Sequence, residues 1–286
     1  MSGRIVCRNL VKVYKTEDVE VVALQGLDLL VEPGELVAVV GASGSGKSTL
    51  QSILAGLEPP TAGAAEVAGW DLTSLPERRR REFRLRTVGF VWQQTAANLV
   101  PYLTVAENVA VPLLLTGAPL RRRRLRIAET LELIGLRELA DADAESLSSG
   151  EQQLLAVAVA LANSPSVLLA DEPTAELDSE SSGRLFDVFR TVSAAGVTVV
   201  VTTHDPLVST SVERTITIRD GRTSAETIRR AAGAAGEEFA VLDAAGRLQL
   251  PPEYVQALGL TGRVRVVLDE NSIEVRPEHG RRRAEP

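Results

Sequence analysis

Three short runs of apolar and β-branched residues stand out in the first two-thirds of the chain: Leu36–Val40, Val167–Ala170 and Val197–Thr203. None of them contains a charged side chain. Unbroken runs of this kind are typical of strands that are buried on both faces of a parallel sheet. Each run is followed by a turn and then by a helix-like segment. The pattern therefore predicts an α/β layer architecture.

A different pattern occupies about residues 95–162. Strand-like runs are rare there, and apolar residues recur at helical spacing, as at Ala128, Leu131 and Ile134. We therefore expect a helical subdomain over these residues, inserted into an α/β domain that spans residues 1–225.

The last fifth of the chain shows a third pattern. Residues 226–238 are rich in Ala and Gly, which favours a helix end or a linker. The strand-like runs that follow are Phe239–Leu242, Arg247–Leu250, Arg263–Leu268 and Ile273–Arg276. A unit of about 40 residues is too small to build a secure core alone. We therefore expect residues 239–277 to pair with another copy, and residues 278–286 to form a basic tail.

The amino-acid composition limits the classes to which this protein can belong. The 286 residues are 44% hydrophobic and 24% charged, the balance of a soluble globular protein. A net charge of −7 gives no general basic surface for nucleic acid. The single cysteine, Cys7, excludes an internal disulfide, and two histidines leave little material for a zinc site.

Charged residues also argue against a membrane span. Basic residues interrupt the N-terminus, so no signal peptide is expected, and the least charged stretch is broken by Asn163 and Pro165. We expect the chain to fold in the cytosol. The arginine runs at residues 78–81 and 121–124 are interpreted as solvated helix faces, with a juxtamembrane role as the alternative.

The segment Gly41-Ala-Ser-Gly-Ser-Gly-Lys-Ser48 fits the phosphate-loop pattern G-x-x-x-x-G-K-[ST]. It lies directly after the predicted strand Leu36–Val40 and before a predicted helix. In such a loop the backbone N–H groups surround a phosphate, a lysine neutralises the β- and γ-oxygens, and the last hydroxyl binds Mg²⁺. The predicted nucleotide-binding residues are Gly41, Ser43, Gly44, Ser45, Gly46, Lys47, Ser48 and Thr49.

Two acidic residues follow the predicted strand Val167–Ala170. Ligands of open α/β sheets bind at the carboxyl ends of the strands. We expect Asp171 to hold Mg²⁺ through its water shell and Glu172 to polarise the attacking water.

These motifs resemble those of ATP-binding-cassette (ABC) ATPase subunits over about residues 3–225, most closely the macrolide-exporter, lipoprotein-release and cell-division type. The resemblance implies ATP and Mg²⁺ as cofactors. Tyr14, in Val-Tyr-Lys, matches the aromatic residue that stacks on adenine. Gln93, in Gly-Phe-Val-Trp-Gln, matches the glutamine that touches Mg²⁺ and relays to the membrane partner. His204, in Thr-Thr-His-Asp, matches the histidine that senses the γ-phosphate.

One motif departs from this family's pattern. The family's Leu-Ser-Gly-Gly-Gln appears as Leu147-Ser-Ser-Gly-Glu151. By resemblance, Ser148 and Gly150 bind the γ-phosphate held by the opposite subunit. Glu151 brings a negative charge close to that triphosphate, which ought to weaken the closed dimer. Harmless drift and a weakened composite site, as in a heterodimer with an intact partner, are both open.

Residues 239–277 resemble the swapped-hairpin (AbrB-like) fold, in which two chains exchange hairpins. The resemblance rests on Asp243-Ala-Ala-Gly-Arg247 and on Arg263-Val-Arg-Val266. Seven arginines and nine acidic residues between positions 237 and 286 give no phosphate-neutralising field. A dimerisation or regulatory role is therefore expected, with DNA binding as the alternative.

The expected protein is a P-loop NTPase with a RecA-like core, a helical subdomain and a small, mostly β C-terminal domain. Two subunits, expected to be copies of this chain, would close around two Mg-ATP at the cytoplasmic face of the membrane and drive a separate permease. One alternative is a cassette ATPase acting on nucleic acid or ribosomes, although the chain has neither a second cassette nor a large insertion. Another is a soluble nucleotide-sensing dimer with the C-terminal domain as its output.

Overall fold

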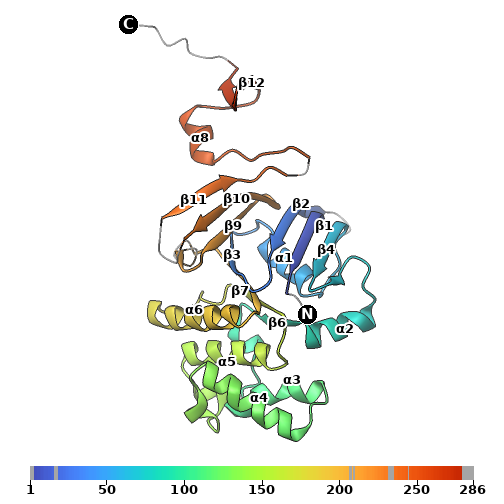
Figure 1. Cartoon of the computed structure of the whole chain (residues 1–286), viewed down its shortest axis with the longest axis vertical. Helices are drawn as coiled ribbons and strands as arrows, with labels where there is room; N and C mark the ends of the chain where they lie inside the picture. The colour runs from blue at the N-terminus through green and yellow to red at the C-terminus, as the bar shows by residue number, and fades with distance from the viewer. Residues whose placement is uncertain are drawn as a thin grey trace.

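The computed structural model describes residues 3–15, 19–205, 208, 210–230, 235–243 and 245–278. Among them, a seven-stranded sheet with the order β11-β10-β9-β3-β8-β7-β6 runs through the centre of the molecule (Figure 1). Its parallel strands are β3 (Leu36–Val40), β6 (Val88–Val91), β7 (Val167–Asp171), β8 (Thr198–Thr203) and β9 (Arg214–Arg219). The predicted α/β architecture is confirmed, and the three apolar runs are β3, β7 and β8.

The antiparallel edge of this sheet differs from the expected domain boundary. β10 (Arg222–Arg229) pairs with β9, and β11 (Gly236–Ala240) pairs with β10. The sheet therefore extends into the segment that was expected to be a linker, over residues 226–238. At the described ends of that segment, composition was a poor guide because backbone hydrogen bonds to β9 and β10 stabilise a sheet edge whatever the side chains are.

A second sheet covers one face of the first. It is antiparallel, with the order β2-β1-β4-β5, and contains β1 (Ile5–Lys15), β2 (Glu20–Val31), β4 (Ala62–Val67) and β5 (Trp70–Asp71). Helix α1 (Lys47–Leu54) lies between the sheets, and its Leu50 and Ile53 are fully buried. Helix α2 (Glu77–Arg86) buries Phe83 against the same core.

Helices form the other layer and the lower lobe of the molecule in Figure 1. They are α3 (Val105–Leu115), α4 (Leu120–Leu133), α5 (Ser149–Leu161) and α6 (Ser179–Ala194), with short 3-10 helices at Thr95–Ala97, Arg137–Leu139 and Ala144–Ser146. A capping box fixes the start of α3, where the Thr104 hydroxyl accepts the Glu107 N–H and the Glu107 carboxylate accepts the Thr104 N–H. The segment predicted to be helical contains all of these elements except α6.

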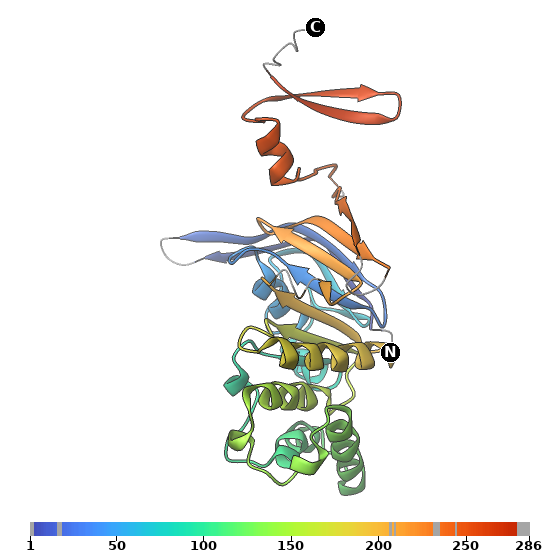
Figure 2. The same ribbon diagram turned by 90° about the vertical axis from the view of Figure 1, so that its left-hand side faces the viewer.

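The end of the chain projects from the body. Helix α8 (Pro252–Ala257) leads to the hairpin of β12 (Val264–Asp269) and β13 (Ser272–Pro277), which stands apart in Figures 1 and 2. The first predicted hairpin is reduced to one bridge between Leu242 and Leu248, because β11 pairs with the central sheet instead. Most of the predicted basic tail lies outside the described residues. Within the described part of the chain, no helix has the length and hydrophobicity to span a membrane.

Candidate functional site

The phosphate loop joins the end of β3 to the start of α1. Gly44 and Gly46 have φ angles of 78° and 105°, a region that favours glycine. A Cβ on Gly46 would approach the Ala23 carbonyl oxygen to 2.7 Å, so the loop accepts no side chain there. Gly221, in the turn between β9 and β10, supports the loop from behind by donating its N–H to the Ser45 carbonyl at 3.1 Å.

This loop leaves polar groups available to an anion. The first turn of a helix has N–H groups without intrahelical acceptors, and no side chain caps α1. The Ser45 hydroxyl is buried and has no partner among the described residues. The ammonium of Lys47 donates to the carbonyls of Gly41 at 2.8 Å and Ala42 at 3.1 Å, within the loop itself. A phosphate would complete the hydrogen bonding of this cradle.

Asp171 ends β7 beside the loop and is held by its neighbour on β8. The Thr202 hydroxyl donates to Asp171 Oδ1 at 2.5 Å, and Thr202 is fully buried. The Gln51 amide lies behind both, with Nε2 3.4 Å from Thr202 Oγ1 and 3.3 Å from the Ala170 carbonyl. Neither Gln51 nor Thr202 was predicted as a site residue. Thr202 could have been noticed in the sequence as a hydroxyl-bearing residue at the end of the valine run of β8.

Glu172 is held in a left-handed conformation, with φ 47°, and its N–H donates to the Thr202 carbonyl at 2.9 Å. Its carboxylate contacts His204 Nδ1 and lies 4.0 Å from Lys47 Nζ. The carboxylate is largely buried, with its side chain 13% exposed. The three predicted residues therefore meet at the carboxyl edge of the sheet.

A cavity of about 750 Å³ opens over the loop. The predicted residues that line it are Tyr14, Ser43, Gly44, Gly46, Lys47, Ser48, Thr49, Gln93, Glu172 and His204. Gly41, Ser45 and Asp171 do not line it, although Gly41 and Ser45 belong to the loop and Asp171 precedes Glu172. Val21, Val22, Ala23 and Ala42 complete the lining. The lining of the cavity thus combines one aromatic ring, Tyr14, with the ammonium of Lys47 and several hydroxyl groups.

The donors around the cavity suit a hard cation in the company of phosphate. Ser48 contributes a hydroxyl and Gln93 an amide to the wall, and the carboxylate of Asp171 directly precedes the lining residue Glu172 in the chain. The described residues contain no group of three His, Cys, Asp or Glu side chains that could hold a metal by themselves. Mg²⁺ commonly takes one or two carboxylates plus substrate phosphates, so the residues fit Mg²⁺ bound with a nucleotide.

Ser148 and Gly150 do not line this cavity. Ser148 caps α5, and its hydroxyl donates to the Glu151 carboxylate at 2.6 Å. Both residues lie at the start of α5, close to α6, where a Cβ on Gly150 would meet Ser181 Oγ at 2.6 Å. Within one chain, this motif is separate from the phosphate loop.

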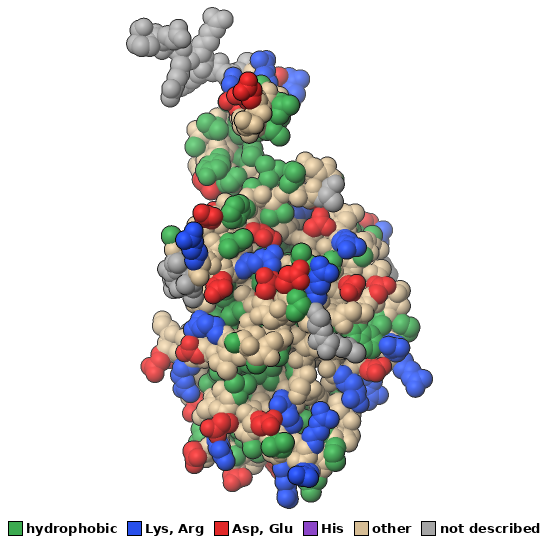
Figure 3. Space-filling model, in the orientation of Figure 1, with side chains coloured by type: hydrophobic (Ala, Val, Ile, Leu, Met, Phe, Trp, Pro, Cys, Tyr) green, Lys and Arg blue, Asp and Glu red, His purple; other side chains and the backbone are tan. Residues whose placement is uncertain are grey.

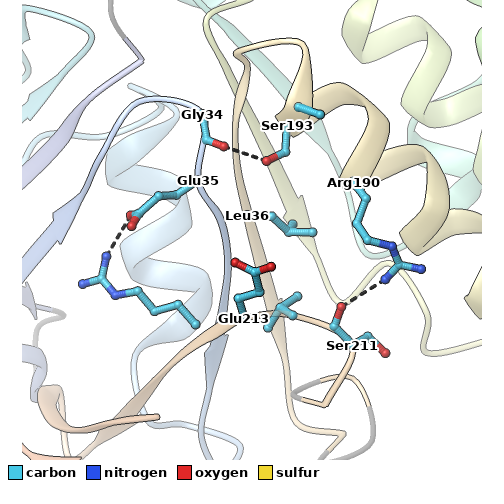
Figure 4. Close-up of a pocket in the computed structure, with 10 residues that line it drawn as sticks. Gly34, Glu35, Leu36, Arg190, Ser193, Ser211 and Glu213 are labelled. Atoms are coloured by element: carbon cyan, nitrogen blue, oxygen red, sulfur yellow. Dashed lines mark hydrogen bonds and ion pairs between the residues drawn. The ribbon is translucent and has the colours of Figure 1, made fainter. Parts of the chain in front are cut away.

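A second cavity, of about 410 Å³, lies at the opposite, amino end of the parallel strands (Figure 4). Its polar groups largely pair with one another: Ser193 Oγ donates to the Gly34 carbonyl at 2.7 Å, and Arg190 donates to the Ser211 carbonyl at 3.1 Å. Glu35 pairs with Arg214 at 2.8 Å. None of the predicted site residues lines it, so it has no part in the site described above.

Comparison with known proteins agrees with this geometry. A family profile described as "ABC transporter" matches residues 24–175. The lipoprotein-releasing system ATP-binding protein LolD 1 of Caulobacter vibrioides is 42% identical over 224 residues, covering 78% of this chain and 95% of that protein. The macrolide export ATP-binding/permease protein MacB of Shigella flexneri is 37% identical over 265 residues, covering 92% of this chain. The chain spans 41% of the length of that MacB relative.

A solved structure shares the fold. The dimeric structure of a post-hydrolysis state of the ATP-binding cassette MJ0796, bound to ADP and Pi, superposes with a TM-score of 0.71 at 35% sequence identity. The match covers 79% of this chain and 99% of that chain. The region matched by the family profile contains the phosphate loop, Gln93, Ser148, Asp171 and Glu172.

Proposed function

The chain belongs to the ABC transporter family, and from that premise we propose that it is the ATP-hydrolysing subunit of a transporter complex that drives a separate membrane permease. The observation that carries the proposal is the single cavity in which Lys47, Gln93, Glu172 and His204 meet beside the phosphate loop. The permease and the cytoplasmic face of the membrane as the site of action are part of the proposal.

Nucleotide binding uses several groups that line the cavity or the phosphate loop. The loop N–H groups and the Ser45 hydroxyl receive the phosphates, and Lys47 exchanges its loop carbonyls for phosphate oxygens. Ser48, Gln93 and Asp171 would hold Mg²⁺, which supplies charge neutralisation at the phosphate oxygens when it is bound. Tyr14, which also lines the cavity, offers its ring to the base.

Hydrolysis uses the residues at the ends of β7 and β8. Glu172 positions the attacking water and accepts its proton, because its carboxylate is the one that faces the cavity. His204 contacts that carboxylate and orients it, and it also lies in the wall where a γ-phosphate would end. Lys47, 4.0 Å from the carboxylate, stabilises negative charge during transfer.

A second subunit completes the site. Ser148 and Gly150 lie away from their own cavity, so they serve only a nucleotide held by another copy. The MJ0796 cassette, which shares this fold, is dimeric. Closure of two copies around two nucleotides, and reopening after hydrolysis, converts the chemistry into movement.

A groove beside the Gln93 loop supports docking of a permease. It has a volume of about 220 Å³ and is lined by Leu99, Pro101 and Gln152 among others. Tyr102, next to it in sequence, is 82% exposed. All of its lining residues belong to the helical subdomain, and a groove of this kind fits a short helix of a membrane partner. Movement of Gln93 on hydrolysis would then be transmitted to that partner.

The C-terminal unit supports pairing of two copies, in the manner of a swapped hairpin. In the β12–β13 register, Val264, Val266 and Leu268 face Pro277, Val275 and Ile273, so one face of the hairpin is apolar. Leu268 is 81% exposed and Ile273 69%. A hairpin that packs against nothing else is only marginally stable. Figure 3 shows hydrophobic side chains exposed in this upper part of the molecule, where a second copy could cover them. A second copy on a cassette dimer would be present at about millimolar effective concentration.

One observation favours a second candidate function, a soluble nucleotide-sensing dimer with the C-terminal unit as its output. The Ser148 hydroxyl, which would bind the partner's γ-phosphate, is engaged by Glu151. A dimer whose closure is weakened in this way would still respond to bound ATP, but it would deliver less free energy to a permease. Purification of the chain from membranes distinguishes the two functions. A permease should co-purify with a transporter subunit, and none should co-purify with a soluble nucleotide sensor.

The experiment that tests the leading function measures Mg-ATP binding and hydrolysis by the full chain and by Lys47→Ala. We expect the variant to lose tight binding, because no other lysine lines the cavity. Arg79→Ala, on the surface of α2, is the control and should bind as the parent does. Equal Mg-ATP binding by the parent and Lys47→Ala would contradict the site.

A further inference from the structure

Three side chains form a cluster behind the ring of Tyr14. The Tyr14 hydroxyl donates to Glu58 Oε1 at 2.6 Å, and the other oxygen of Glu58 lies 2.7 Å from Lys12 Nζ. The same ammonium donates to the Pro59 carbonyl at 2.9 Å and lies 5.0 Å from the centroid of the Tyr14 ring. Each member of the cluster therefore contacts both of the others.

The cluster is more buried than an ordinary surface ion pair. The side chains of Lys12 and Glu58 are 11% and 25% exposed, whereas the Lys15–Glu20 pair on the same β1–β2 hairpin is 68% and 55% exposed. Burial and the hydrogen bond to Glu58 raise the pKa of Tyr14, which keeps its hydroxyl protonated as a donor. A charge-assisted hydrogen bond of this kind holds an aromatic ring in one orientation.

The cluster connects two parts of the nucleotide cavity. Tyr14 lies near the end of β1, and Glu58 follows α1, whose first turn continues directly from the phosphate loop. The Tyr14 hydroxyl also interacts with Thr49 in that first turn. Because α1 is a rigid element, Glu58 and Thr49 fix the position of the ring relative to the phosphates.

We propose that Glu58 and Lys12 are positioning residues that hold the Tyr14 ring ready to stack on the purine base of the nucleotide. The inference rests on the proposed function, and neither residue belongs to a recognised motif of the chain. The contribution is preorganisation, because a ring already held in place loses less rotamer freedom when the base binds. It acts on base binding and leaves the hydrolysis step unchanged.

The test compares two probes, Mg-ATP and inorganic tripolyphosphate, by calorimetry on the full chain. For Glu58→Ala and for Tyr14→Phe we expect the Kd for Mg-ATP to rise about 3- to 10-fold, the usual effect of one lost hydrogen bond. The double variant should show no further rise. The Kd for tripolyphosphate should not change, because that ligand has no base.

Two further variants control for structural damage. Glu58→Gln keeps an acceptor for the Tyr14 hydroxyl and should recover part of the affinity for Mg-ATP. Glu20→Gln removes the exposed ion pair on the same hairpin and should bind both probes as the parent does. In steady-state hydrolysis, the KM for ATP should rise in Glu58→Ala while kcat stays constant.

Each other outcome overturns the inference. An unchanged Kd for Mg-ATP in Tyr14→Phe and Glu58→Ala would remove the cluster from base binding. An equal loss for both probes would mean that the substitutions damage the phosphate loop. Failure of the parent to bind either probe would instead overturn the proposed function, and the inference with it.

Discussion

The hydroxyl of Ser148 donates a hydrogen bond to the carboxylate of Glu151 at 2.6 Å, and the Ser148 N–H donates to the same oxygen at 2.9 Å. The two residues form a capping box at the start of α5. Both hydrogen bonds, with a smaller contribution from Arg184, hold the pKa of Glu151 below its usual value. Glu151 is therefore charged at neutral pH. It accepts a hydrogen bond from the Ser148 hydroxyl, the group that the family resemblance expects to bind the γ-phosphate held by a partner subunit.

Replacing this carboxylate by an amide tests whether it restrains the dimer. Glu151→Gln removes the negative charge near the triphosphate while keeping a side chain that can cap α5. We expect ATP-induced dimerisation in light scattering, or ATP turnover, to increase several-fold. An unchanged dimerisation constant and turnover would mean that the departure from the family's glutamine is harmless.

The same carboxylate gives a pH dependence of stability. Because the pKa of Glu151 is lower in the folded chain than its ordinary value of 4.5, the stabilisation is complete above that value and is lost as the pH falls through the folded pKa. The Tm of the parent should exceed that of Glu151→Ala at pH 7. Calorimetry should show the difference shrinking below about pH 4.5, and a constant difference would contradict the assignment.

Removal of the general base should separate binding from hydrolysis. In Glu172→Gln the amide cannot accept the proton of the attacking water, so we expect hydrolysis to slow by about 10²- to 10⁴-fold while Mg-ATP still binds. A coupled phosphate-release assay and a nucleotide-binding assay measure the two steps. A turnover equal to that of the parent would exclude Glu172 from the mechanism.

The buried contact between Thr202 and Asp171 should affect the metal requirement. Thr202→Val keeps the shape of the side chain but removes the hydroxyl that orients Asp171. We expect the Mg²⁺ concentration for half-maximal ATP binding to rise about 3- to 10-fold, the effect of one lost hydrogen bond. Thr202→Ser, which keeps the hydroxyl, should resemble the parent. If Thr202→Val and Thr202→Ser respond alike, the hydroxyl has no such role.

The apolar face of the C-terminal hairpin should decide the apo oligomeric state. Val266→Ser changes the apolar face, whereas Arg265→Ser changes the opposite face of the same strand. If two hairpins pair, light scattering without nucleotide should show a monomer for Val266→Ser and a dimer for Arg265→Ser and the parent. A monomeric parent would contradict the pairing, and tight binding of duplex DNA at physiological salt would favour the DNA-binding alternative.

Local sequence was sufficient for the features that depend on neighbours along the chain. The runs that became β3, β7 and β8 are buried on both faces, so their apolar character is continuous and readable. The phosphate loop is equally local, because a strand end, glycines and a helix start must be contiguous to surround a phosphate. Glu172 was identified from the acidic pair after the second of these strands, and His204 from the family resemblance of the segment Thr-Thr-His-Asp.

Only the tertiary structure decided which distant groups meet. Glu58 reaches Tyr14 across 44 positions and Thr202 reaches Asp171 across 31, and no periodicity links such pairs. The pairing of β11 with β10 was likewise hidden, because the hydrogen bonds of a strand edge come from backbone groups that every non-proline residue carries. The pattern of apolar side chains predicts which residues are buried. Which residue each buried or hydrogen-bonded group contacts depends on how the whole sheet packs.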